Sequence, residues 1–94
     1  MKHNFRELTI WKRAMDVVTS LYQLVSKLPS EEKFGLKSQM TRAAVSIPSN
    51  ISEGSERSTN KDFKRFLDIS LSSSYELETQ HLICKNLLIL KLII

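Results

Sequence analysis

Residues 9–28 read TIWKRAMDVVTSLYQLVSKL, and the pattern in this stretch decides the fold class. Its apolar residues recur at alternating intervals of three and four, at Trp11, Ala14, Val18, Leu21, Val25 and Leu28. Such spacing places them on one face of an α-helix. Further apolar residues flank this stripe, namely Met15, Val17, Tyr22 and Leu24. We therefore expect a helix over residues 8–28 with a broad buried surface, as in a globular helical bundle.

A second helix is predicted over residues 30–53. Ser30 is followed by two glutamates, and a serine with acidic residues in the first turn is typical of a helix N-terminus. Proline removes a backbone donor and disfavours helical geometry in the preceding residue, so we expect a kink or a short break at Pro48. Gly54 is placed to end this helix.

The third predicted helix covers residues 59–90 and begins with Thr59 and Asp62, which are spaced as in a capping box. Serines at positions 70 and 72–74 make one flank of this helix small and polar. The last eight residues comprise seven aliphatic residues and one lysine. Three alternatives follow for these residues: they extend the third helix, fill a groove of the bundle, or aggregate.

Composition agrees with a single all-α domain over residues 1–94. The 94 residues are 41% hydrophobic, enough for one modest core, and 2 Gly with 2 Pro are too few turn formers for a sandwich or barrel. Three helices of these lengths bury only part of their apolar surface, which favours self-association. The chain has neither the apolar run of a signal peptide nor a membrane-spanning run, so we expect a cytoplasmic protein.

Residues for catalysis or for a metal are sparse, and we predict neither an enzyme nor a cofactor. The single cysteine, Cys84, with two histidines cannot complete a structural zinc site or an internal disulfide. His81 lies one turn before Cys84 but lacks a third orienting group, so Cys84 is interpreted as a small buried hydrophobe. Glu76 and Glu78 cannot share one helix face, and no phosphate loop or dinucleotide motif is present.

The distribution of charge suggests a partner. The net charge is +4, and residues 33–65 carry seven basic and three acidic residues. Lys61, Lys64 and Arg65 share one helix face near a helix N-terminus, where a phosphate backbone is favoured. The candidate nucleic-acid-binding residues are Arg57, Lys61, Lys64, Arg65, Lys33 and Lys37. The alternative is an ordinary solvated surface, which is common on small domains.

Three segments together show a resemblance. Residues 5–18 (FRELTIWKRAMDVV), 34–57 (FGLKSQMTRAAVSIPSNISEGSER) and 62–80 (DFKRFLDISLSSSYELETQ) closely resemble the bacterial four-helix-bundle proteins encoded in intervening sequences of 23S ribosomal RNA genes. The resemblance implies an up-and-down antiparallel bundle that assembles into a homopentameric ring with a basic surface and no enzymatic activity. It extends to the accessory protein of diversity-generating retroelements, which binds nucleic acid and associates with a reverse transcriptase.

The resemblance also marks a central signature of structural or assembly residues. These are Arg42, Ser46, Pro48, Asn50, Glu53 and Gly54, together with Arg57. We expect Asn50 and Glu53 to form a polar network with Arg42 or Arg57 that fixes register or assembly.

The chain departs from the family pattern at its end, where NLLILKLII stands in place of a turn and a fourth helix. We expect a bundle with a truncated fourth helix and an exposed groove between the first and third helices.

Three functional hypotheses follow. The chain is an oligomer that binds RNA or a nucleoprotein through phosphates without reading bases, or a protein-interaction adaptor, or a remnant of the family without retained function.

Overall fold

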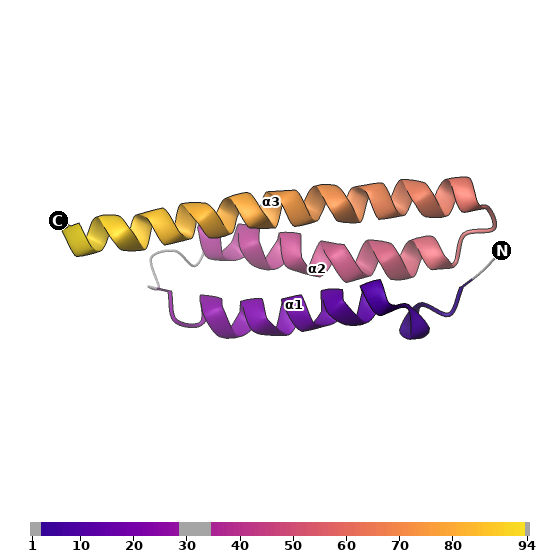
Figure 1. Ribbon diagram of the computed structural model, residues 1–94, viewed down its shortest axis with the longest axis horizontal. Coiled ribbons are helices and arrows are strands. Elements are labelled where there is room, and N and C mark those ends of the chain that lie inside the picture. Colours follow the sequence, from indigo (N-terminus) through magenta and orange to yellow (C-terminus); the bar gives the residue numbers. More distant parts are fainter. Residues whose placement is uncertain (1–2, 29–34, 94) are drawn as a thin grey trace.

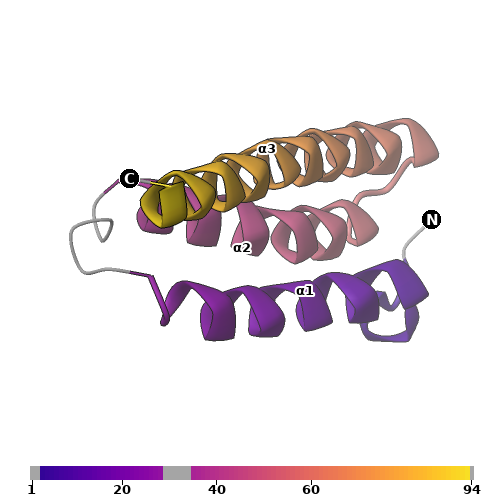
Figure 2. The ribbon, with the colours of Figure 1, turned by 60° about the vertical axis from the view of Figure 1, so that its left-hand side comes forward.

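The computed structural model describes residues 3–28 and 35–93, and side chains up to Leu87. This part of the chain is all-α, as predicted. A 3-10 turn η1 (Phe5–Glu7) precedes three helices, α1 (Thr9–Val25), α2 (Leu36–Ser55) and α3 (Asn60–Ile93). The helices run antiparallel in sequence order, and α2 packs against both α1 and α3 (Figure 1). Turning the molecule shows α1 and α3 on the two sides of α2 (Figure 2).

The helix boundaries differ from the predicted ones where local geometry opposes helix. α1 ends at Val25 rather than at residue 28, and a turn follows in which the Leu28 amide donates to the Val25 carbonyl at 3.1 Å. α2 begins at Leu36 rather than at residue 30, because Gly35 (φ −100°, ψ −111°) lies outside helical geometry. Ser30 and Pro29 lie outside the described residues.

The beginning of α3 follows the predicted cap. The Asp62 amide donates to Thr59 Oγ1 at 3.1 Å, which satisfies one of the unpaired donors at the helix N-terminus. The helix then continues to Ile93, so the aliphatic tail extends the third helix. The described residues form three helices, and a fourth helix remains a prediction.

Of the two alternatives expected at Pro48, a kink or a short break, the structure excludes the break. The helix continues through Pro48 to Ser55, although proline inside a helix costs about 3 kcal/mol. Tertiary contacts are present at this turn. Pro48 is buried, and the Ile47 carbonyl accepts a hydrogen bond of 2.9 Å from Ser70 Oγ on α3.

Gly54 has a different role from the predicted helix end. It is a buried helical residue without the positive φ of a left-handed cap. A Cβ added at Gly54 would lie 2.6 Å from Phe66 Cβ and 3.0 Å from Phe63 Cδ1. The missing side chain therefore lets the end of α2 approach the beginning of α3.

The core lies along α2, where Met40 and Ala44 have no exposed surface. The stripe of α1 packs on it as predicted, with Leu21 and Val25 buried. The flanking α1 residues are an exception, because Met15, Val17, Tyr22 and Leu24 are 38–51% exposed. Val17 and Leu24 lie on the flank of the stripe toward α3, and Met15 and Tyr22 lie on the opposite flank. No described residue covers either flank fully, so the buried surface is narrower than predicted.

We predict that Gly54→Ala destabilises the protein by about 1–3 kcal/mol, because the new Cβ meets the backbone-attached Cβ of Phe66. Urea unfolding followed by circular dichroism measures the change. Ser49→Ala, at an exposed position of the same helix, is the matched control and should stay within about 0.5 kcal/mol of the parent. An alanine at position 54 that stabilises the helix, as intrinsic propensity alone favours, would contradict the close approach.

Candidate nucleic-acid interface

Four of the candidate cations gather at the turn between α2 and α3. Arg57 lies in this turn, where its amide donates to the Gly54 carbonyl at 3.0 Å. Lys61, Lys64 and Arg65 follow in the first two turns of α3, at the spacing that places them on one face. We call Arg57, Lys61, Lys64 and Arg65 the turn cluster.

A phenylalanine ring organises two members of the turn cluster. Arg57 Cζ lies 4.6 Å and Arg65 Cζ 5.0 Å from the centroid of the Phe66 ring. The two guanidinium groups are therefore within about 10 Å of each other. Cation–π contacts of this kind contribute about 0.5–1 kcal/mol at exposed sites. Because Phe66 is buried against Gly54, its ring brings both arginines to the same end of the helix pair.

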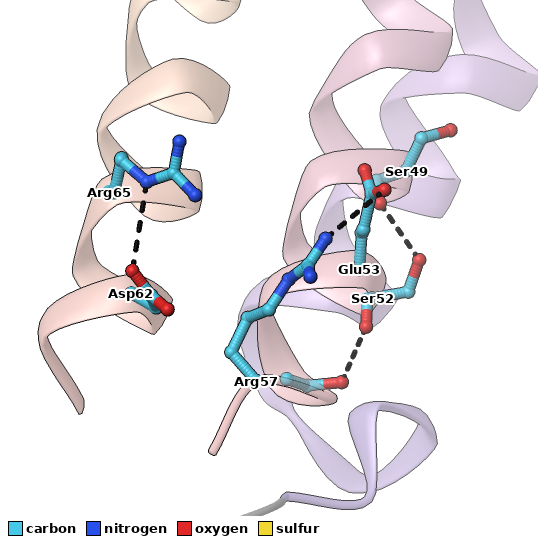
Figure 3. A network of polar contacts seen from close by, with 7 residues as sticks. Ser49, Ser52, Glu53, Arg57, Asp62 and Arg65 are labelled. Atoms are coloured by element: carbon cyan, nitrogen blue, oxygen red, sulfur yellow. Dashed lines mark hydrogen bonds and ion pairs between the residues drawn. The ribbon is translucent and has the colours of Figure 1, made fainter. Parts of the chain in front are cut away.

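Acidic residues pair with three cations of the cluster. Figure 3 shows Glu53 beside Arg57 at the end of α2, and Asp62 beside Arg65 on α3. The N–O distances are 3.5 Å for Arg57–Glu53, 2.9 Å for Lys64–Asp68 and 3.8 Å for Arg65–Asp62. Lys61 has no ion pair among the described residues. Residues 53–68 contain four basic and four acidic residues, so the cluster is locally neutral.

The other two candidates do not join the cluster. Lys37 lies in the first turn of α2, about 30 Å from Arg57 at 1.5 Å per helical residue. Lys33 lies outside the described residues. The basic residues that the sequence concentrates in 33–65 therefore do not form one continuous surface.

Part of the expected polar network is present, and it is divided in two. Glu53 contacts Arg57, as described above. Asn50 does not join this pair, and its Nδ2 donates instead to the Ser46 carbonyl at 2.8 Å and to Ser46 Oγ at 2.9 Å. Ser46 Oγ lies 2.9 Å from Ser73 Oγ and so links α2 to α3.

Arg42 takes part in neither group. Its guanidinium donates to Ser38 Oγ at 3.4 Å on the same helix. It borders a hollow of about 220 Å³ between α2 and α3, together with Ser46, Ser73 and Glu76. The two α3 serines that reach α2, Ser70 and Ser73, were visible in the sequence only as a small polar flank.

The structure places the two residues considered for catalysis in different environments. Cys84 is buried in the core cluster, whereas His81 is exposed. The described residues contain no group of three or more His, Cys, Asp or Glu side chains that could hold a metal ion.

A second surface feature is an apolar groove of about 770 Å³ between α1 and α3, as expected from the sequence. We call it the α1/α3 groove. Its α1 wall includes Val17 and Leu24, its floor includes Ile47, and its α3 wall includes Leu67 and Leu71. Charged and polar side chains of α3, among them Glu78 and His81, line its far end.

The chain was compared with families of known proteins. Residues 6–92 match the family model described as 23S rRNA-intervening sequence protein. A search of curated proteins found no match to the chain. In the part of the chain that the structure describes, no helix is long and apolar enough to cross a membrane.

We predict that Ser73→Ala lowers the free energy of unfolding by about 1 kcal/mol, because it removes the hydrogen bond between α3 and Ser46. Ser72→Ala is the matched control on the exposed side of α3 and should change stability by at most about 0.5 kcal/mol. Chemical unfolding of both variants measures the difference. Equal stabilities would show that the serine contact between the helices contributes nothing.

Proposed function

Because the chain belongs to the 23S rRNA-intervening sequence protein family, we propose that it is a self-associating helical-bundle protein that binds RNA through phosphates and catalyses no reaction. The observation that carries this proposal is the turn cluster, in which Arg57 and Arg65 share one aromatic ring. Two guanidinium groups held close together suit a phosphate backbone, because each donates paired hydrogen bonds to phosphate oxygens.

The ion pairs of the cluster do not prevent such binding. Every side chain in the three pairs is at least 41% exposed. Exposed pairs of this kind stabilise a protein by about 0–1 kcal/mol, so a phosphate can replace a carboxylate at small cost. Lys61 has no ion pair among the described residues, so it can bind a phosphate without giving up a carboxylate partner. Local neutrality does, however, imply modest affinity and strong dependence on salt.

The aromatic residue at the cluster argues against base recognition. Phe66 is 8% exposed, and its ring contacts Arg57 and Arg65. A ring in this position offers no open face on which a base could stack. The contacts that remain are to phosphates, which position a nucleic acid but do not read its sequence.

We predict that Lys61→Glu with Lys64→Glu weakens binding of a short single-stranded RNA at least tenfold at low salt. Fluorescence anisotropy over a salt series measures both affinity and slope. The slope of log K against log salt should fall by roughly 1.4, from about 0.7 per lost phosphate contact. The matched control is Lys12→Glu on α1 with Lys27→Glu in the turn after α1, which changes net charge equally outside the cluster and should retain most of the binding.

Three outcomes would count against this proposal. Absence of RNA binding at low salt, or binding that does not depend on salt, would exclude a phosphate-directed interaction. Equal losses for the two double variants would show that total charge, not the turn cluster, determines affinity. A defined oligomer that ignores RNA but retains a protein partner after nuclease treatment would favour the adaptor hypothesis.

A further inference from the structure

The N-terminal segment places an aromatic ring beside the turn cluster. It lies at the end of the bundle where α2 turns into α3 (Figure 1). The His3 amide donates at 3.0 Å to the carbonyl of Ser55, two residues before Arg57. The His3 ring packs on the ring of Phe63, with 5.0 Å between the centroids and 43° between the planes. The segment therefore contacts both α2 and α3 next to the cluster.

The two phenylalanines of this region both pack on Gly54, and they differ in what lies on them. A Cβ at Gly54 would lie 3.0 Å from Phe63 Cδ1 and 2.6 Å from Phe66 Cβ, so the two side chains are neighbours. Phe66 is 8% exposed, and the arginines of the turn cluster lie on its ring. Phe63 carries His3 instead, and both of these residues are half-buried. His3 therefore extends the aromatic packing from Gly54 to the surface.

We propose that His3 is a stacking position for one base of a single-stranded RNA whose phosphates are bound by the turn cluster. Unpaired bases stack on aromatic side chains, histidine included. Because the imidazole already packs on Phe63 and the His3 amide is hydrogen-bonded to α2, a base that stacks there requires little further ordering. This inference deepens the proposed RNA binding and rests on it.

Stacking at this position selects for single strands without reading their sequence. Every base has a π-face, so a flat ring accepts any of them, but only when the base is not paired within a duplex. The turn cluster alone makes no such distinction, because phosphates are present in both forms of RNA. His3 therefore adds a preference that the cations do not provide.

Two unpaired cations lie near His3. Lys61 is two residues before Phe63 on α3, and Arg6 follows His3 in the N-terminal segment. Neither has an ion pair within the described part of the chain, and the exposed Arg6 guanidinium lies 4.5 Å from the centroid of the Phe5 ring. Three residues span at most about 10 Å, which bounds the distance between the Cα atoms of Arg6 and His3. A strand with one base on His3 thus has unpaired cations within reach of its neighbouring phosphates.

The test compares two labelled strands with the same number of phosphates. One is a short RNA without self-pairing, and the other is a strand of equal length built from stable abasic residues. Fluorescence anisotropy at low salt measures both dissociation constants. The parent should bind the RNA at least fivefold more tightly than the abasic strand. His3→Ala should bring the two constants to within about twofold and leave the constant of the abasic strand unchanged.

Two further variants identify what His3 contributes. His3→Phe retains a flat ring and removes the imidazole nitrogens, so it should keep the preference for the RNA over the abasic strand. Loss of the preference in His3→Phe would show that the imidazole acts by charge or hydrogen bonding and would overturn the stacking position. His81→Ala is the matched control, because it removes the other histidine of the chain, which is exposed on α3, and it should change neither constant.

The remaining outcomes separate this inference from the proposed function. Equal binding of the two strands by the parent would overturn the stacking position and leave phosphate binding standing. A preference that persists in His3→Ala would place the base elsewhere and also overturn it. Equal losses for both strands in His3→Ala would show that His3 only anchors the N-terminal segment. Failure of either strand to bind at low salt would overturn both proposals.

Discussion

The close approach of α2 to α3 is the constraint on which the other features depend. It is possible because Gly54 has no side chain where Phe66 packs, and because alanines face the core farther along α2. Phe66 is thereby held at the end of the bundle, and its ring places Arg57 and Arg65. The cationic surface is a consequence of this helix contact, since the arginines come from different elements and meet only at the ring.

Helix existence and the main apolar faces were predictable because they depend on local periodicity. The stripe of α1 and the Thr59 cap of α3 follow from spacing alone. The break considered at Pro48 and the helix end placed at Gly54 were wrong for a shared reason. Local rules treat them as helix breakers, whereas packing against α3 and the Ser70 hydrogen bond maintain the helix through both.

The candidate site was predictable in part. Spacing placed Lys61, Lys64 and Arg65 on one face. The same spacing places Asp68 beside Lys64 and Asp62 beside Arg65, and the prediction did not weigh these carboxylates. Nor did it weigh that Lys37, near the start of the second predicted helix, lies at the end away from Arg57. The serines that join α2 to α3 have no distinctive local signal, because a serine on a helix looks the same whether it faces solvent or another helix.

The packing of α1 on α2 alone has a consequence for dynamics. Among the described residues, α2 is held by both neighbours, while α1 contacts only α2 and the η1 turn. Cooperative unfolding in small domains proceeds by units with different opening free energies. In a single copy, α1 is the unit with the fewest neighbours, so its amide protons exchange with solvent before those of the α2–α3 pair. Assembly that covers the groove would slow this exchange selectively in α1, making amide protection in one helix a report on the state of association.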